Sequence, residues 1–375
     1  MNEKPIRVLH VVSCMNCGGA ETMIMNLYRN IDRSILQFDF IVHNEEKGYY
    51  DEEIIKLGGR IIRCKSLGTI GVFKYINQIS NIIIKKGPFN AVHAHTDIQS
   101  GVVALAAKIA GVKIRVTHSH STELQHKSNY KFKIYYKILS VIIKLFSNNY
   151  CACSTKAGEF LYGKKNIENL IVLNNGIDVD KFLELDVNKI KKLKKDFLIE
   201  DSCIVLGHIG RFIEVKNHKF IIRIAKKLKE MKIKYKFILV GDGVLLNDIL
   251  EEIKKEKLDE EFIFLGLRKD VHDILKIIDI FIMPSLYEGI PVALIEAQAS
   301  NVTCIISDKI DGESDMGLNL THRVSLESGE LNWCNNIIRL SKSKSDKLNI
   351  KKQLKLKGYD VIDNINKIYK LYGIR

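Results

Sequence analysis

Residues 280–306 read IFIMPSLYEGIPVALIEAQASNVTCII: a short apolar run, a loop, a helical stretch and a second apolar run. Two such runs on either side of a helix are typical of a β-α-β unit in a parallel sheet. Pro291 suits the first turn of a helix, because its missing N–H would have no partner there. Residues 292–300 are therefore predicted to be helical, and the whole stretch predicts an α/β fold.

The same pattern recurs along the chain in two series. The apolar runs of the first series are residues 6–12, 38–42, 91–94, 114–117, 150–153 and 170–173. Those of the second series are residues 203–209, 235–240, 262–265, 280–283 and 303–306. Each series predicts one Rossmann-like, doubly wound domain. A charged, weakly apolar stretch at 183–202 separates the two series.

The chain's 375 residues are enough for two domains with a core each. We predict one domain at residues 1–185 and a second at 186–359. A helical pattern at about 360–375 could pack back on the first domain. Ligands favour the space between two such domains, where the carboxyl ends of strands meet, so a central cleft is predicted.

Composition and charge narrow the class of protein. Hydrophobic residues make up 46% and charged residues 27%, which is the balance of a folded globular protein. No stretch approaches 18 uncharged apolar residues, and residues 1–7 lack the pattern of a secretory signal. We therefore expect a cytoplasmic protein. The eight cysteines are irregularly spaced, so we expect small buried hydrophobes rather than metal or redox sites.

The net charge of +14 is concentrated in one region. Residues 113–165 hold ten basic residues against two acidic ones, a local excess of +8. Within it, residues 130–147 form an amphipathic pattern, whose apolar members are Ile134, Ile138, Val141, Ile142 and Leu145 and whose basic members are Lys133, Lys137 and Lys144. A basic amphipathic helix suits an anionic membrane such as the inner face of the cell membrane. A core helix with solvated lysines is the alternative.

Two carboxylates flank the predicted helix at 292–300. Glu288 stands in the loop before it, and Glu296 is expected two turns in, on its side. The free N–H groups of a first helical turn carry partial positive charge and suit an anionic phosphate. One carboxylate could meet a sugar hydroxyl and the other a ribose. An ordinary helix with a solvated glutamate is the alternative.

Two cations follow the first strand of the second series. The strand ends in Gly210 and Arg211, and Lys216 comes five residues later. A guanidinium offers fork geometry and an ammonium a point charge, so the pair could neutralise a diphosphate without a metal. Arg211 could instead bind main-chain carbonyls, and Lys216 could be solvated.

Glycines end several predicted strands. Gly18 and Gly19 stand at a strand-to-helix turn, where main-chain N–H groups can approach a phosphate or a sugar closely. Gly241 ends another strand, and the backbone around Leu267 and Arg268 could hold the edge of a nucleobase. The dinucleotide-binding and P-loop patterns are both absent from the sequence.

Paired histidines end two strands of the first series, as His93 with His95 and His118 with His120. We expect the two members of each pair to point to opposite faces, so that at most one is aimed at a ligand. His118 or His120 could hydrogen-bond a transferred sugar or a diphosphate. No metal site is predicted.

Taken together, these motifs resemble the group 1, family 4 glycosyltransferases over roughly residues 6–310. The matching motifs are Gly18-Gly19-Ala20-Glu21, Asn175-Gly176-Ile177-Asp178, Gly210-Arg211, Lys216-Asn217-His218, Val240-Gly241-Asp242-Gly243, Pro284-Ser285, Glu288-Gly289-Ile290-Pro291 and Glu296-Ala297. The resemblance implies the GT-B architecture: two Rossmann-like domains around a cleft, with an acceptor-side first domain and a nucleotide-sugar-binding second domain. Capsular and exopolysaccharide enzymes are the most similar in character.

The resemblance also implies roles for residues. Arg211 and Lys216 would bind the diphosphate, Glu288 the donor sugar, and Glu296 the ribose or a sugar hydroxyl. The full predicted donor-binding set is Gly18, Gly19, Gly210, Arg211, Lys216, Gly241, Leu267, Arg268, Glu288, Gly289, Ile290 and Glu296. The family's first-domain histidine corresponds to His118 or His120, and we favour His120; the predicted catalytic set is His120, His118, Glu288, Arg211 and Lys216.

By the same resemblance the enzyme is a retaining, metal-independent hexosyltransferase. It would use a UDP- or GDP-sugar, no cofactor, and a glycan or polyprenyl-linked acceptor, and the leaving phosphate would help to deprotonate that acceptor. The sequence departs from the common family pattern at residues 309–315, which puts donor contacts there in doubt. An epimerase or phosphorylase on the same fold is one alternative. A basic nucleic-acid-binding protein is another, although we expect no nucleic-acid partner.

Overall fold

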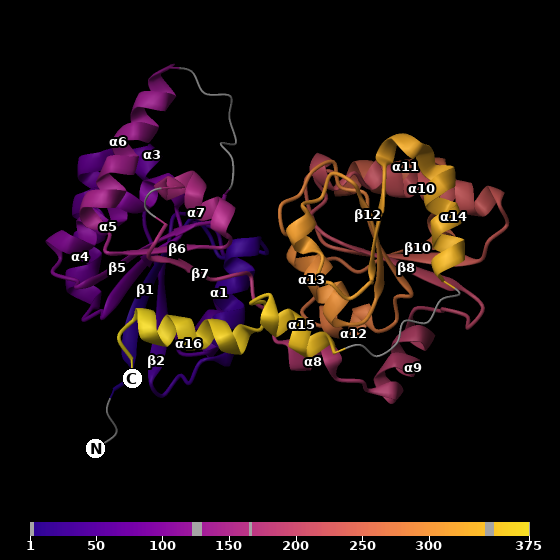
Figure 1. The fold of residues 1–375 in the computed structure, drawn as a ribbon, viewed down its shortest axis with the longest axis horizontal. Coiled ribbons are helices and arrows are strands. Elements are labelled where there is room, and N and C mark those ends of the chain that lie inside the picture. Colours follow the sequence, from indigo (N-terminus) through magenta and orange to yellow (C-terminus); the bar gives the residue numbers. More distant parts are fainter. Residues whose placement is uncertain (1–3, 122–129, 165–166, 342–348, 375) are drawn as a thin grey trace. The chain divides into compact units, whose positions relative to one another are not determined.

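The computed structural model describes residues 4–121, 130–164, 167–341 and 349–374. The chain forms two compact units (Figure 1). The first comprises Met1–Asp178 together with Gly358–Arg375, and the second is Val179–Lys357. The chain therefore leaves the first unit after Asp178 and returns to it at Gly358.

The first unit is built on a seven-stranded parallel sheet in the order β3-β2-β1-β4-β5-β6-β7. Its strands are β1 (Ile6–Val12), β2 (Leu36–Val42), β3 (Ile61–Arg63), β4 (Ala91–Ala94), β5 (Ile114–Ser119), β6 (Asn149–Ala152) and β7 (Leu170–Val172). Its helices are α1 (Gly19–Asn30), α2 (Asp51–Lys56), α3 (Leu67–Ile70), α4 (Val72–Lys86), α5 (Ser100–Ile109), α6 (Tyr130–Phe146), α7 (Thr155–Tyr162) and α16 (Val361–Leu371), with a short 3₁₀ turn η1 (Asp97–Gln99). This is the predicted doubly wound arrangement.

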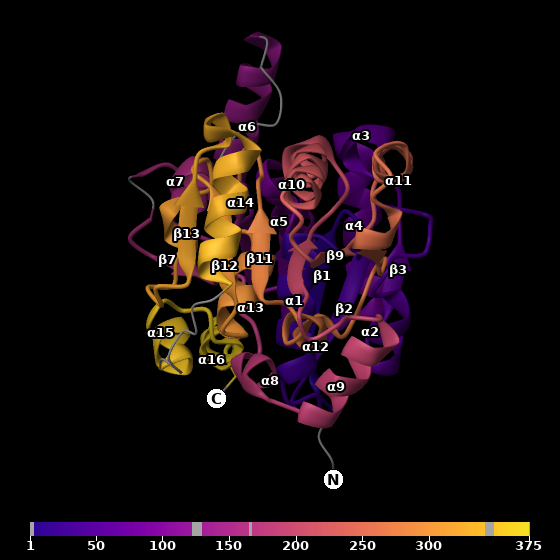
Figure 2. The same cartoon turned by 90° about the vertical axis from the view of Figure 1, so that its right-hand side faces the viewer.

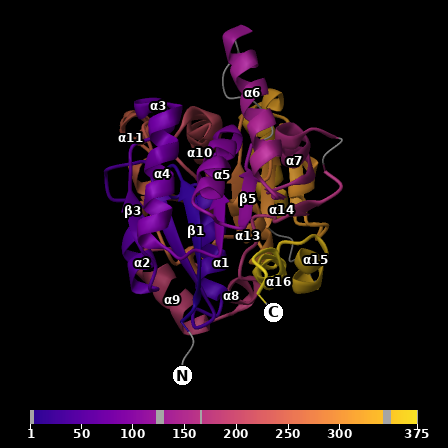
Figure 3. The same ribbon diagram turned by 90° about the vertical axis from the view of Figure 1, so that its left-hand side faces the viewer.

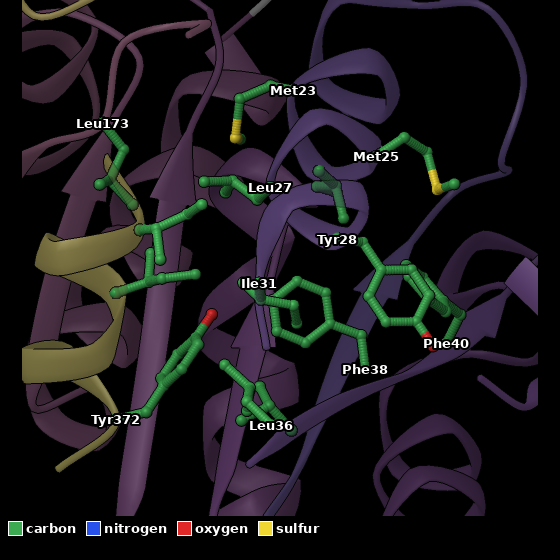
Figure 4. Packing of buried hydrophobic residues seen from close by; sticks show 14 of the residues in the cluster. Met23, Met25, Leu27, Tyr28, Ile31, Leu36, Phe38, Phe40, Leu173 and Tyr372 are labelled. Carbon is green, nitrogen blue, oxygen red and sulfur yellow. The ribbon is translucent and has the colours of Figure 1, made fainter. Parts of the chain in front are cut away.

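Both faces of this sheet are covered, which is why its strands read as continuous apolar runs. Helices α4 and α5 cover one face, as the view of Figure 3 shows. On the other face α1 packs beside α16, although the two helices are more than 300 residues apart in sequence. Figure 4 shows Ile31, the C-cap residue of α1, between Tyr372 on one side and Phe38 on the other, with Leu27 of α1 above it.

The second unit has a six-stranded parallel sheet in the order β10-β9-β8-β11-β12-β13. Its strands are β8 (Ile204–Ile209), β9 (Tyr235–Val240), β10 (Phe262–Phe264), β11 (Ile280–Met283), β12 (Thr303–Ser307) and β13 (Thr321–Val324). Its helices are α8 (Val179–Leu183), α9 (Val187–Asp196), α10 (His218–Glu230), α11 (Leu246–Lys255), α12 (Val271–Leu275), α13 (Val292–Ala299), α14 (Gly329–Leu340) and α15 (Ile350–Leu356). Short 3₁₀ turns are η3 (Glu214–Lys216), η4 (Asp259–Glu261), η5 (Gly312–Ser314) and η6 (Leu326–Ser328).

The core of the second unit lies between its sheet and the adjoining helices α10 and α14, which Figure 2 shows side by side. Trp333 of α14 is fully buried and packs edge-on against Phe220 of α10, with ring centroids 5.3 Å apart. Among the described residues, no helix is both long enough and apolar enough to cross a membrane.

Candidate active site

An ion pair between Lys216 and Glu288 lies where the sequence predicted donor contacts in the second unit. The Lys216 ammonium donates to Glu288 Oε1, and only 15% and 16% of the two side chains are exposed. The two residues are 72 positions apart in sequence. Each charge is thus held in place by the other, in a partly buried position where electrostatic interactions are stronger than in water.

The main chain around this pair is tied together by hydrogen bonds. The Leu286 N–H donates to the Val215 carbonyl at 2.8 Å, and the Asn217 side-chain amide donates to the Pro284 carbonyl at 3.0 Å. Asn217 has φ +55°, a conformation that asparagine tolerates well, and it is the N-cap residue of α10. Lys216 is therefore held at the junction of η3 and α10.

Gly210 leaves room for the stem of Lys216. A Cβ atom at Gly210 would lie 3.2 Å from Lys216 Cε. Arg211, the next residue, is exposed, and the described residues provide its side chain with no ion-pair or hydrogen-bond partner. Its guanidinium can therefore contact a ligand without breaking an existing ion pair.

Helix α13 begins at Val292, shortly after Glu288, Gly289 and Ile290. Pro291 is its N-cap residue rather than its first helical residue, and no side chain caps it. Glu296 is the fifth residue of the eight in α13 and is half-buried, so it lies one turn in and not two as predicted. The prediction of a helix at residues 292–300 is confirmed by these bounds.

Residues 309–315, which depart from the family pattern, contact the main chain of Glu288. Ile310 forms a parallel bridge with Glu288, and the Asp311 N–H donates to the Glu288 carbonyl at 3.0 Å. Arg323 donates to the Ile310 carbonyl at 2.5 Å. Sequence reasoning missed these residues, because main-chain contacts leave no signature in residue type.

Gly241 has a structural role that the sequence prediction did not include. Its φ is +144°, and a Cβ atom there would lie 2.0 Å from the Gly210 carbonyl oxygen. The ends of β8 and β9 can therefore approach each other only with glycine at this position. Leu267 is exposed, and Arg268 forms two hydrogen bonds to Asp270 at 2.8 and 2.6 Å.

Two buried histidines, His208 and His218, lie close enough to Lys216 for its charge to act on them. His208 Nδ1 lies 2.8 Å from the Ile282 carbonyl, and His218 stacks on Phe212 with ring centroids 4.1 Å apart. Burial, together with the positive charge of Lys216, lowers the pKa of His218 to about 4, and burial lowers that of His208 well below its usual value. Both rings are therefore neutral at pH 7 and add no charge to the site.

In the first unit, Gly18 is the N-cap of α1 and Gly19 begins the helix. The Glu21 carboxylate lies over Gly18, where a Cβ atom would come 2.2 Å from Glu21 Oε2. Asn175 approaches Gly19, with its Nδ2 atom 3.6 Å from the place of a Cβ. The two glycines thus allow close approach of side chains from both sides.

The paired histidines do not point to opposite faces, and that prediction was wrong. Residues two apart on a strand share a face of the sheet. The rings of His93 and His95 stack with centroids 4.2 Å apart, as do those of His118 and His120. With His10 of β1 they form one cluster of five rings.

Only one of the two candidate catalytic histidines is open to a ligand. His118 is fully buried, whereas His120 is half-buried at the carboxyl end of β5. The His120 main-chain N–H donates to Asp97 Oδ1 at 2.8 Å, and the Ser121 hydroxyl donates to Asp97 Oδ2 at 2.9 Å. Asp97 itself has φ +45°. Sequence reasoning missed Asp97, although an aspartate two residues after His95 was visible.

Two groups of histidines in the described residues have nitrogen atoms close enough to hold one metal ion: His10, His93 and His95, and His95, His118 and His120. No cysteine belongs to either group. All eight cysteines are free, and three of them, Cys151, Cys304 and Cys334, are buried while the rest are half-buried.

Comparison with known proteins agrees with the motifs. The family model described as Glycosyltransferase Family 4 matches residues 17–181, and that of Glycosyl transferases group 1 matches residues 189–355. The putative glycosyltransferase EpsF of Bacillus subtilis is 42% identical, over 100% of this chain and 98% of that protein. This chain belongs to the group 1, family 4 glycosyltransferases.

More distant relatives of this glycosyltransferase have more specific names. An Escherichia coli protein named UDP-Gal:alpha-D-GlcNAc-diphosphoundecaprenol alpha-1,3-galactosyltransferase is 25% identical over 98% of this chain and 96% of its own length. The crystal structure of Anabaena HepE with UDP and glucose superposes with a TM-score of 0.74, at 18% identity, covering 98% and 99% of the two chains. The GT-B fold predicted from the sequence is therefore confirmed, and the chain is a hexosyltransferase.

Proposed function

We propose that this glycosyltransferase transfers a hexose from a UDP- or GDP-sugar to a glycan or polyprenyl-linked acceptor during synthesis of a surface polysaccharide, with retention of anomeric configuration and without a metal. The observation that carries the proposal is the Lys216–Glu288 pair at the amino end of α13. A cation, a nearby carboxylate and an uncapped helix end provide the charges that an anionic diphosphate with an attached sugar requires.

Charge development during the reaction explains why these groups are needed. The bond between the anomeric carbon and the β-phosphate oxygen breaks, and the acceptor oxygen bonds to the same face of that carbon. The acceptor proton passes to the leaving phosphate oxygen. Negative charge therefore grows on the diphosphate, where Lys216 and the exposed Arg211 would stabilise it. Glu288 would accept hydrogen bonds from the donor sugar.

The relatives support this choice of substrate. The E. coli relative is named for UDP-galactose and a diphosphoundecaprenol acceptor, and HepE was crystallised with UDP and glucose. A Staphylococcus aureus relative, 27% identical over 83% of this chain and 83% of its own length, is named for capsular polysaccharide biosynthesis. Lipid-linked and surface glycans are therefore the first acceptors to test.

Calorimetry tests the donor and the metal together. UDP-glucose, UDP-galactose and GDP-mannose are titrated into the full chain, once with EDTA and once with manganese. We expect at least one of them to bind with EDTA present. Binding only with manganese would contradict metal independence, and no binding in either buffer would contradict the nucleotide-sugar assignment. The ¹H–¹H coupling at the anomeric position of the product then shows whether configuration is retained.

We further propose that α6 contacts an anionic membrane on the cytoplasmic side. Leu139 and Ile143 of α6 are buried against the unit's core. A second stripe of apolar side chains, each about one turn from the next, is exposed instead: Ile134 at 45%, Ile138 at 53%, Val141 at 50% and Leu145 at 63%. Figure 1 shows one end of α6 extending beyond the other helices of the first unit.

The stripe has cations beside it. Lys137 and Lys144 are exposed and lie along one side of the apolar stripe by helical spacing. The side chain of Lys133, which the sequence analysis placed with them, lies outside the described residues. An apolar stripe bordered by lysines suits a helix that lies in the plane of a membrane interface. One face of α6 is therefore core, as the second sequence alternative expected, and the exposed face is the one that we propose contacts the membrane.

Vesicle sedimentation tests the membrane proposal. The double variant Lys137→Glu, Lys144→Glu should lose binding to vesicles that contain phosphatidylglycerol, because each lysine near an anionic surface contributes about 1 kcal/mol. The matched control is Lys85→Glu, Lys86→Glu at the end of α4, which changes the net charge equally on another exposed part of the first unit. Equal binding by both double variants would contradict a specific role for α6.

A further inference from the structure

The five clustered histidines of the first unit form two hydrogen-bonded chains. In one, Tyr372 Oη lies 2.7 Å from His93 Nδ1, and His93 Nε2 lies 3.1 Å from His118 Nδ1. In the other, His10 Nδ1 lies 3.0 Å from His95 Nε2, and His95 Nδ1 lies 2.9 Å from His120 Nε2. Only the second chain reaches His120, the histidine that is open to a ligand.

Each ring in the second chain is neutral at pH 7. Burial lowers the pKa of His10 to about 3 and that of His120 to about 4, and it lowers the pKa of His95 well below its usual value. A neutral imidazole has one N–H and one bare nitrogen. Every hydrogen bond in the chain must therefore run in the same direction, and the state of one ring determines the other two.

The buried end of the chain favours one direction. His10 Nε2 is buried and has no hydrogen-bond partner among the described residues. If the bonds run inward, so that His120 donates to His95 and His95 to His10, His10 Nε2 carries a buried N–H without an acceptor. If they run outward, so that His10 donates to His95 and His95 to His120, His10 Nε2 is a bare nitrogen. A buried N–H without a partner is the rarer and costlier arrangement in proteins, so the outward direction is favoured.

The open end of the chain is His120. Its main-chain N–H donates to Asp97, and its Nε2 lies against His95 Nδ1. Nδ1 is therefore the ring nitrogen of His120 that remains for a ligand. With the bonds running from His10 toward His120, that nitrogen carries the proton.

We infer that His10 and His95 hold His120 in the Nδ1–H tautomer, so that His120 offers the substrate a hydrogen-bond donor and not a base. His120 would donate to an oxygen of the donor sugar or the diphosphate, and His95 and His10 are positioning residues. The inference rests on the proposed function for the identity of that oxygen. The tautomer itself is a property of the free protein.

Nitrogen NMR of the full chain labelled with ¹⁵N-histidine tests the tautomer without any donor. Long-range ¹H–¹⁵N correlations at pH 7 should show His120 protonated at Nδ1 and bare at Nε2. A proton on Nε2 or a charged ring would overturn the inference. So would one equivalent of zinc in metal analysis of the same sample, because a metal-bound nitrogen cannot take part in the chain. These results do not depend on whether a nucleotide-sugar binds.

A matched pair of variants tests the role of His95. In His95→Gln the side-chain amide offers His120 both a donor and an acceptor, so a second His120 tautomer should appear in the spectrum. His93→Gln is the control, because His93 lies two residues before His95, is also buried, and belongs to the other chain. The inference fails if His120 remains entirely in the Nδ1–H form in His95→Gln.

Substitution of His120 itself separates a donor from a base. The amide of asparagine can place an N–H close to the position of Nδ1–H, whereas alanine cannot. His120→Asn should therefore keep about tenfold more kcat/KM than His120→Ala, the value of one hydrogen bond. If the two variants are equally impaired, His120 does not act as a donor.

Discussion

Lys216 and Glu288 form an ion pair, and both side chains are largely buried. Lys216→Ala should lower kcat about a hundredfold or more, because it removes a cation from the developing charge of the leaving group. Glu288→Ala should lower activity as well, by removing the partner of Lys216 and the acceptor for the donor sugar. The measurement is steady-state transfer from the nucleotide-sugar identified by calorimetry.

The control for this pair is Lys219→Ala, which removes an exposed lysine from the first turn of α10 without touching Glu288. It should keep normal turnover. Circular dichroism and the melting temperature should show that Lys216→Ala and Glu288→Ala remain folded. Near-normal turnover in either of these two variants would contradict the roles assigned here.

Buried neutral histidines make the protein sensitive to acid. The pKa of His10 is lowered to about 3 and those of His120 and His218 to about 4, all below the usual 6.5 of the unfolded chain. Between about pH 6.5 and 4 the unfolded state therefore binds more protons than the folded one. The stability that these neutral rings contribute is fully present above about pH 6.5 and is lost as the pH falls.

Urea denaturation at pH 7 and pH 5 measures this loss. Each such histidine should lower the unfolding free energy by up to about 1.4 kcal/mol per pH unit in that range. The clear expectation is a lower urea midpoint at pH 5 in both units, since the histidine cluster lies in the first and His208 and His218 in the second. Equal midpoints at the two pH values would show that these rings are not buried and neutral.

At the level of single residues, the sequence identified side chains but not their surroundings. Arg211, Lys216 and Glu288 could be selected as candidates because they follow a strand end or precede a helix start, and of these the structure pairs Lys216 with Glu288. The face shared by His93 and His95 was misjudged, although the period of a strand determines it. The hydrogen-bond directions among the rings depend on His10, which is 85 residues from His95 and gave no local signal.

At the scale of secondary-structure elements, the turn at Gly241 has no room for a side chain. Gly241→Ala should destabilise the second unit by at least about 2 kcal/mol, because both the positive φ and the contact with the Gly210 carbonyl oppose a side chain. Gly266→Ala is the matched control. It has φ +61° but nothing within 4 Å of the added atom, so only the backbone term of about 1 kcal/mol remains.

Thermal unfolding of the two glycine variants gives the comparison directly. The Gly241 variant should melt at a lower temperature than the Gly266 variant. The opposite order, or two equal shifts, would show that β8 and β9 can separate enough at their ends to accept a methyl group.

The strands were predictable where they are buried on both faces. Tyr235–Val240 and Ile280–Met283 match the predicted runs at both ends, because continuous apolar residues leave little choice of structure. Strands β3 and β13 were missed. Each lies at one edge of its sheet and contains arginine, so each has a partly polar sequence that does not stand out from the loops around it.

At the scale of the whole molecule, α16 belongs to the first unit although it follows the second in sequence. A chain ending at Lys357 lacks the buried side chains of Val361, Ile365, Ile368, Leu371 and Tyr372. Their burial contributes on the order of 10 kcal/mol, which is comparable to the stability of a domain. The first unit of the truncated chain should therefore be digested by protease, while residues 179–357 resist.

Mass spectrometry of the digest identifies which unit survives. Tyr372→Phe is the control, because it removes only the hydrogen bond to His93, worth about 1 kcal/mol, and should leave both units resistant. If the truncated chain resists protease throughout, α16 is not required for the first core.

The return of the chain at Gly358 also bears on how the protein is made. A ribosome adds about 5–20 residues per second, so the 179 residues of Val179–Lys357 take roughly 10–40 seconds to emerge. Throughout that time the nascent first unit exposes the apolar surface of α1 that α16 will cover. The second unit is continuous in sequence, so it can fold while the first unit still exposes that surface, and the nascent chain is most prone to aggregate during this interval.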